Sequence, residues 1–270
     1  MAPVVAALLP HPPLLVPELA GAAAAELDPL RAACRHALSA VLAATRRAVV
    51  VGDGPVWGVP EPSAPGSFRP YGADLEVTLP PLADLDLPGL PPPDGLPGLP
   101  LSLAVAAHLL AALDPPPSPL SAATVPPSLG PGAAAAIGRA LVDAVATGPG
   151  TAPRSGDPRR STRGAAAPGD PVGLVVMGDL SARRSERAPG ALHPGAAGFD
   201  ASVAEALRTG KPERLLDLDP AEAADLLVAG RVPLQVLAGA LQDRPDARGQ
   251  VLYEDAPYGV GYLVALLTSP

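Results

Sequence analysis

The stretch VGLVVMGDLSARRSERAPG, residues 172–190, decides the fold that we expect for this chain. It opens with an apolar run rich in valine over residues 172–177, which predicts a fully buried strand. The run ends at the turn dipeptide Gly178-Asp179, and a polar segment rich in arginine follows. Open α/β sheets place their ligand sites at the edge where such strands end. The competing interpretation is an ordinary strand-to-helix connection with a solvated run of charges.

Two further predicted strands, at residues 3–9 and 48–51, also end in short turns. His11 follows the first strand and is held between prolines, which fix the backbone around it. Asp53 follows the second strand, between two glycines. If the three strands are parallel, His11, Asp53 and Asp179 lie at the same edge of one sheet. A hydrogen-bonded structural histidine is the competing interpretation of His11.

The spacing of apolar residues elsewhere predicts helices between strands, and therefore an α/β sandwich with a central mixed, largely parallel sheet flanked by helices. A closing hairpin at 250–254 and 260–267 makes the sheet mixed. Residues 147–171 hold almost no large apolar side chain, which predicts a disordered insertion inside a single domain spanning 1–270. Other expected elements are a helix within 19–44 that begins at Asp28, an edge strand at 74–79, irregular chain at 55–71 and 80–100, helices at 101–113 and 131–146, a strand at 121–125 and a helical series from 199 to 241.

Composition excludes several classes of function. The net charge of −8 argues against general binding of nucleic acid, which needs a basic face. No uninterrupted apolar run is long enough to cross a membrane, and the N-terminus lacks the basic start of a signal peptide, so we expect a cytoplasmic protein. The one cysteine, Cys34, excludes an internal disulfide and a metal site built from cysteine alone.

Aromatic residues make up only 3% of the chain, yet they gather in two loops. Trp57 lies in the loop after the second strand, and Tyr258 lies at the turn of the last hairpin. Together they could line a pocket for a flat or apolar ligand. The alternative is that large side chains simply fill the loops. His193 lies downstream of Ser181 in a loop that could reach the same edge of the sheet.

The order of these motifs resembles that of a known family. A strand followed by Pro10-His11-Pro12-Pro13, a strand followed by Gly52-Asp53-Gly54, the segment Met177-Gly178-Asp179-Leu180-Ser181, and the closing Ala256-Pro257-Tyr258-Gly259-Val260-Gly261-Tyr262 are similar to the catalytic B subunit of class III extradiol ring-cleavage dioxygenases. The related Memo-like proteins share that architecture. The resemblance covers nearly the whole chain except residues 147–171.

The resemblance implies a non-haem ferrous ion held by two histidines and a carboxylate, with open positions for a catechol and dioxygen. His11 matches the first metal histidine, Asp53 stands where the second is expected, and Glu254 or Asp255 could supply the carboxylate. Ala182 stands at the position where the family has an acid/base histidine. This donor set would suit another divalent metal about as well as Fe(II).

Three functions therefore stay open. The first is a divergent, metal-dependent oxidoreductase acting on a small aromatic diol, with His11, Asp53 and Glu254 as metal ligands. Trp57 and Tyr258 would contact the substrate, and Asp179 or His193 would replace the missing proton shuttle. The second is a non-catalytic relative that binds a ligand or a protein partner without metal. The third is a metal-dependent hydrolase, because carboxylate-rich sites suit metal-activated water. Members of this superfamily often pair, so a homo-oligomer is a further expectation.

Overall fold

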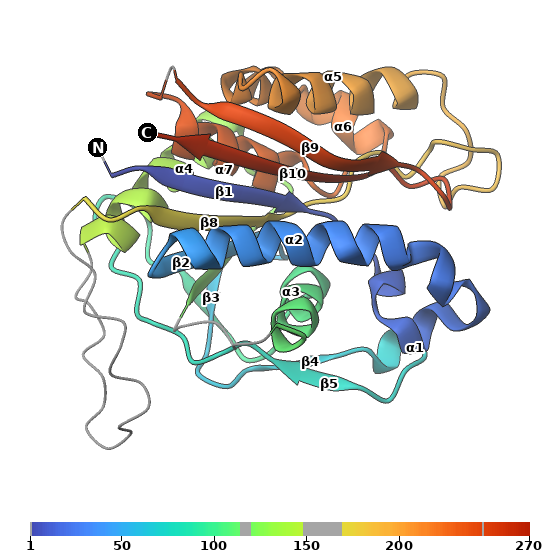
Figure 1. The fold of residues 1–270 in the computed structure, drawn as a ribbon, viewed down its shortest axis with the longest axis horizontal. Coiled ribbons are helices and arrows are strands. Elements are labelled where there is room, and N and C mark those ends of the chain that lie inside the picture. Colours follow the sequence, from blue (N-terminus) through green and yellow to red (C-terminus); the bar gives the residue numbers. More distant parts are fainter. Residues whose placement is uncertain (1, 114–119, 148–168, 245) are drawn as a thin grey trace.

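The computed structural model describes residues 2–113, 120–147, 169–244 and 246–270 (Figure 1). Their main sheet has eight strands in the order β6-β3-β7-β2-β8-β1-β10-β9, and a small second sheet pairs β4 with β5. The strands are β1 (Val4–Leu9), β2 (Arg47–Asp53), β3 (Gly58–Pro60), β4 (Pro65–Ser67), β5 (Glu76–Thr78), β6 (Asp94–Leu96), β7 (Ser121–Val125), β8 (Val172–Met177), β9 (Arg248–Asp255) and β10 (Tyr262–Ser269).

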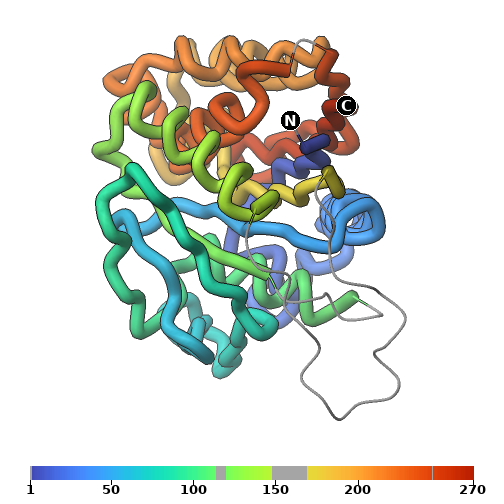
Figure 2. Tube along the Cα trace, turned by 90° about the vertical axis from the view of Figure 1, so that its left-hand side faces the viewer, coloured from blue at the N-terminus to red at the C-terminus, as the bar shows by residue number. Residues whose placement is uncertain are grey.

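Helices cover both faces of this sheet (Figures 1 and 2). The α-helices are α1 (Pro17–Ala20), α2 (Asp28–Ala44), α3 (Leu101–Ala111), α4 (Pro131–Thr147), α5 (Ala196–Arg208), α6 (Pro220–Asp225) and α7 (Arg231–Leu241). The 3-10 helices are η1 (Pro13–Leu15), η2 (Gly21–Leu27), η3 (Arg69–Tyr71) and η4 (Pro212–Asp217). None of the helices in the described part of the chain is long and apolar enough to cross a membrane.

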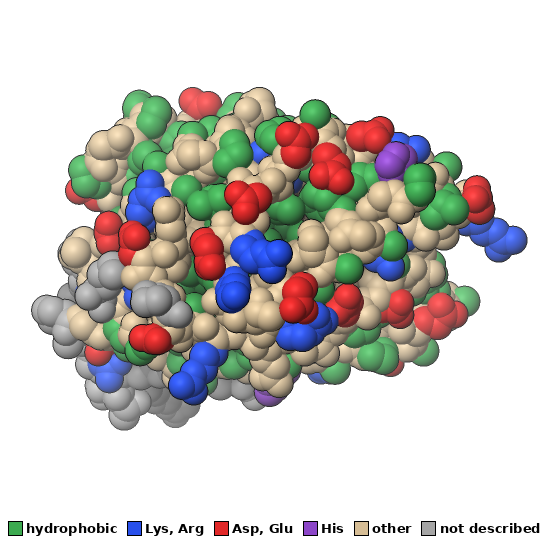
Figure 3. Space-filling view, turned by 90° about the horizontal axis from the view of Figure 1, so that it is seen from above, with side chains coloured by type: hydrophobic (Ala, Val, Ile, Leu, Met, Phe, Trp, Pro, Cys, Tyr) green, Lys and Arg blue, Asp and Glu red, His purple; other side chains and the backbone are tan. Residues whose placement is uncertain are grey.

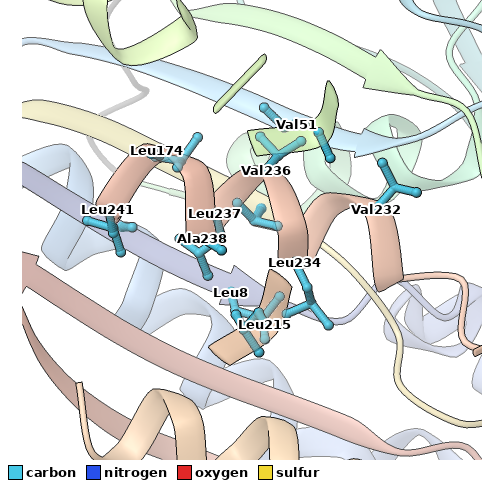
Figure 4. Close-up of a cluster of buried hydrophobic side chains, with 14 of the residues drawn as sticks. Leu8, Val51, Leu174, Leu215, Val232, Leu234, Val236, Leu237, Ala238 and Leu241 are labelled. Carbon is cyan, nitrogen blue, oxygen red and sulfur yellow. The ribbon is translucent and has the colours of Figure 1, made fainter. Parts of the chain in front are cut away.

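The central strands are buried on both faces, which is why they are apolar without interruption. In β1, Ala6 and Leu8 contact the core under α4, α5 and α7, whereas Ala7 and Leu9 contact the core under α2 and α3. The first of these cores is built mainly from leucine, valine and alanine side chains, and α7 packs against β1, β2 and β8 in it (Figure 4). This core is therefore almost wholly aliphatic.

Close contact between α4 and α7 depends on glycine. A Cβ at Gly138 would lie 2.0 Å from the carbonyl oxygen of Val236, and a Cβ at Gly239 would lie 2.2 Å from that of Ala135. The two helix backbones thus approach each other at positions where a side chain would not fit.

The parallel core of the sheet is β7-β2-β8-β1, and the antiparallel pair β10-β9 extends it beyond β1. Val4 pairs with Ser269, so the two ends of the described chain lie side by side (Figures 1 and 2). The predicted α/β sandwich with a mixed, largely parallel sheet is confirmed.

Two predictions of irregular structure are wrong in part. Segment 55–71 contains β3 and β4, and the proline-rich segment 80–100 contains β6. Each of these strands has three residues; β3 joins the margin of the main sheet by one antiparallel pair to β7, and β6 pairs with β3. Proline is tolerated at such margins because fewer backbone N–H groups are needed there. The predicted insertion at 147–171 lies largely outside the described residues; Thr147 closes α4.

Candidate functional site

The chain connections diverge at the ends of β1 and β8, which are neighbours in the sheet. After β1 the chain passes to α2 on one face, whereas after β8 it passes to α5, α6 and α7 on the other. Such a reversal point at the carboxyl ends of parallel strands is where open α/β sheets bind ligands. His11, Asp53 and Asp179 lie at this edge, after β1, at the end of β2 and after β8.

His11 and Asp53 lie in direct contact. His11 Nε2 is 3.1 Å from Asp53 Oδ1, while the His11 side chain is 4% exposed and the Asp53 side chain is 34% exposed. Among the described residues, neither His11 Nδ1 nor Asp53 Oδ1 has a hydrogen-bond partner, although both atoms are buried. Buried polar atoms normally have a partner, so this pair is chemically incomplete as it stands.

Asp179 holds the loop that carries His11. Its Oδ1 accepts a hydrogen bond from the backbone N–H of His11 at 2.7 Å. Burial raises the pKa of the Asp179 carboxyl, while the neighbouring His11 opposes the increase. The negative charge of Asp53 raises the pKa of Asp179 further, because a like charge nearby disfavours ionisation of the Asp179 carboxyl.

Hydrogen bonds to backbone carbonyls hold the chain at or next to each of these residues. Gly178 N–H donates to the carbonyl of Leu9, and Gly230 N–H donates to the carbonyl of Asp179. On the other side, the hydroxyl of Ser102 in α3 donates to the carbonyl of Asp53 at 2.6 Å. The cluster of His11, Asp53 and Asp179, called the edge cluster below, is therefore held by three strands and a helix.

Two more groups lie near Asp179 that the sequence did not single out as site residues. Burial raises the pKa of the Cys34 thiol to about 12, and the charge of Asp179 adds to the increase. Tyr262 is 2% exposed, and its pKa is raised by burial and by Asp179 as well. Both therefore stay neutral at ordinary pH and add no charge near Asp179.

Glu254 lies away from the edge cluster. Its register in β9 places it opposite Leu263, a residue of the core under α5, and its carboxylate pairs with Arg208 of α5 at 2.7 Å. Seen from above, the surface of the molecule has positive and negative side chains interspersed (Figure 3). The sequence-based prediction of a metal triad requires Glu254 to lie beside His11 and Asp53. The structure does not place it there. Among the described residues, no group of three or more His, Cys, Asp and Glu side chains is arranged to hold a metal ion.

His193 and the two aromatic residues also lie apart. His193 Nε2 is 3.3 Å from Asp225 of α6, which also pairs with Arg183. Trp57 donates from Nε1 to the carbonyl of Pro91 and packs against the core under α4 and α7.

Tyr258 packs against the opposite core, under α2 and α3. It therefore does not form one aromatic wall with Trp57, and a substrate-binding role for either residue stays a prediction.

Asp200 is a buried carboxylate beside this region that sequence reasoning missed. It is 3% exposed and accepts hydrogen bonds from the Ser181 N–H and from Arg184. Burial raises its pKa, and those two hydrogen bonds oppose the increase. Its position on the apolar face of a helix, three and four residues before Val203 and Ala204, is the signal that could have revealed it.

Comparison with known proteins gives evidence for the fold only. No family model matches the chain, and no curated protein matches it. A solved structure, "uncharacterized protein JW3007 from Escherichia coli K12", is similar with a TM-score of 0.60 and 15% sequence identity, covering 99% of each chain. The two proteins therefore share their architecture over their whole lengths.

Proposed function

We propose that this protein is a divergent relative of the class III extradiol dioxygenases, in which the edge cluster binds a divalent cation and acts on a small aromatic diol. The observation that carries the proposal is the contact of His11 Nε2 with Asp53 Oδ1 at 3.1 Å, where the carboxylate oxygen has no hydrogen-bond partner among the described residues. Two lone-pair donors that face each other in this way need a shared cation, either a proton or a metal.

The distance between these two atoms fits a metal ion. Metal-ligand bonds of about 2 Å leave two ligands of one ion within about 4 Å of each other, and His11 Nε2 and Asp53 Oδ1 are 3.1 Å apart. His11 and Asp53 would therefore be the two side chains that hold the ion. Because Glu254 pairs with Arg208 instead, the protein supplies two clear donors rather than the three of a facial triad.

One imidazole and one carboxylate suit a loosely held Fe(II), Mn(II) or Mg(II) whose other positions are filled by water or substrate. When bound, such an ion would bring a diol and dioxygen together at neighbouring positions. Asp179 would keep His11 in place through the His11 N–H. Its raised pKa makes Asp179 the candidate for a proton donor, since Ala182 cannot move a proton.

A second candidate function is a non-catalytic relative that binds a small ligand or a protein partner. Two observations favour it: alanine at Ala182, and the pairing of Glu254 with Arg208. The absence of a positioned acid/base group typically lowers a rate by about 10²- to 10⁴-fold. The expected cytoplasmic location, the homo-oligomer and the absence of nucleic-acid and membrane partners stay predictions.

Oxygen uptake distinguishes the two functions. The protein would be loaded with Fe(II) without oxygen and then mixed with oxygen and a panel of catechols, with His11→Ala as the inactive reference and Glu254→Gln as the matched control. The first function predicts diol-dependent uptake in the wild type and in Glu254→Gln but not in His11→Ala. Absence of diol-dependent uptake in all three proteins would favour the non-catalytic relative.

A further inference from the structure

The two margins of the main sheet differ in length and in protection. At one margin, β6 has three residues, and prolines stand on both sides of it in the segment 91–97. Short strands and prolines prevent a further strand from pairing, because they offer few free N–H groups in a straight row. At the other margin, β9 has eight residues and no proline. The β9 margin is therefore the one that can accept another strand.

The backbone of β9 is paired on one side only. β10 pairs with it along its length, and no group outside β10 in the described part of the chain forms a hydrogen bond with the β9 backbone. An antiparallel strand directs its N–H and C=O groups to both sides, so the outward groups can bond to a further strand. None of the eight residues is buried. α5 lies on a face of β9, since the Leu207 carbonyl occupies the place of a Cβ at Gly249.

The side chains of β9 form a pattern that is complementary to itself. Residues 251–253, at its centre, are Val, Leu and Tyr, and all three are half-buried. Arg248 and Asp255, at its two ends, are exposed and carry opposite charges. Among the described residues Arg248 has no ion pair, and Asp255 accepts a hydrogen bond from the N–H of Ala256 next to it. Antiparallel pairing of two such strands brings unlike charges together at both ends.

An irregularity in β9 determines the register of that pairing. Tyr253 pairs with Val264 and Val251 pairs with Ala265, so Leu252 is an extra residue without a partner in β10. A β-bulge of this kind changes which residues of a strand share a face. Residues an odd number of positions apart, on either side of Leu252, therefore point to the same face.

Arg248 and Asp255 share a face for this reason. Arg248 pairs with Thr268 and Asp255 pairs with Tyr262, and residues directly opposite each other in an antiparallel sheet point to the same face. Thr268 and Tyr262 are an even number of positions apart in β10, so they share a face as well. Two copies of β9 with a two-fold axis at Val251 then place Arg248 of each copy opposite Asp255 of the other.

We propose that the outer margin of β9 pairs with β9 of a second copy, antiparallel about a two-fold axis at Val251, so that the main sheet continues from one copy into the other. Backbone hydrogen bonds, the apolar centres at 251–253 and two ion pairs between Arg248 and Asp255 form the interface. Every pair of facing residues lies on one face of the sheet in this register. The interface uses no residue of the edge cluster, so it does not rest on the proposed function.

Light scattering of the full chain over a series of concentrations tests the interface. The wild type is expected to approach twice 26.8 kDa and to dissociate on dilution, with a Kd on the order of micromolar for so small an interface. Arg248→Asp and Asp255→Arg each place like charges opposite each other twice, and each is expected to raise the Kd by roughly five- to thirty-fold. The double variant restores unlike charges and should return to the wild-type Kd. Asp94→Arg, at an exposed position of β6 at the other margin, is the matched control and should leave the Kd unchanged.

A wild type that stays monomeric at every concentration would overturn the proposal. A dimer whose Kd the single reversals leave unchanged would overturn it too, and so would a double variant that does not recover the wild-type Kd. Equal weakening by Asp94→Arg would also contradict it, because the effect would then come from overall charge. The readout uses neither metal nor diol, so failure of the interface and failure of the proposed function are separate results.

Discussion

The Asp179 carboxylate accepts a hydrogen bond from the backbone N–H of His11 at 2.7 Å, so the end of β8 holds the loop that follows β1. The contact joins residues that lie far apart in sequence but follow adjacent parallel strands. It fixes the only imidazole of the edge cluster in place, and it gives the chain a measurable marker of whether the cluster is formed.

Removing the Asp179 carboxylate should release that N–H. Pro10, Pro12 and Pro13 have no amide hydrogen, so His11 supplies the one exchanging amide of residues 10–13. We expect Asp179→Ala to accelerate its exchange by roughly two- to ten-fold, the range for the loss of one hydrogen bond. Asp179→Asn retains an acceptor and should have a smaller effect. NMR hydrogen exchange checks this, and equal protection in Asp179→Ala would contradict the assignment of the bond.

Asp200 should make stability depend on pH. Because burial raises its pKa in the folded state above the unfolded value of about 4, the stability that it contributes is complete below that value. It is then lost as the pH rises through the folded-state pKa. We expect the advantage of the wild type over Asp200→Asn in urea unfolding to shrink as the pH increases above about 4.

Asp225→Asn is the control for that series, since Asp225 is 61% exposed. An advantage of wild type over Asp200→Asn that grows with pH would show that the ion pair with Arg184 outweighs burial.

The α4–α7 contact should not tolerate a side chain at Gly138. A Cβ there would meet the backbone of Val236 at 2.0 Å, and a backbone atom cannot move aside as a side-chain end can. We expect Gly138→Ala to lower the free energy of unfolding by about 1–3 kcal/mol. Gly132→Ala in the same helix has open space around the added Cβ and should change stability by less than about 1 kcal/mol. Thermal and urea unfolding compare the two, and equal stabilities would refute the close approach.

The sequence predicted the edge cluster because parallel strands bring their ends to one edge. The apolar runs of β1, β2 and β8 were long enough to identify, and His11, Asp53 and Asp179 follow from where those runs stop. The three-residue strands β3 and β6 escaped prediction because pairing at the margin of the sheet, rather than their own sequence, makes them strands.

Glu254 shows why the rest of the site could not be read from the sequence. Side chains alternate along a strand, so a register shift of one residue sends a carboxylate to the opposite face. The register of β9 and β10 is irregular between Val264 and Ala265, and Glu254 lies opposite Leu263 beyond that shift. No pattern in the sequence marks the irregularity, and Glu254 therefore pairs with Arg208 rather than completing the edge cluster.

Metal content after reconstitution with Fe(II) in the absence of oxygen is the most direct test of the proposed cation site. The wild type, His11→Ala and Glu254→Gln would each be dialysed to equilibrium against the same free concentration of Fe(II), and the iron bound to each protein would be measured. The proposal predicts near-stoichiometric metal in the wild type and in Glu254→Gln, and none in His11→Ala. Metal absent from the wild type, or retained in full by His11→Ala, would contradict it.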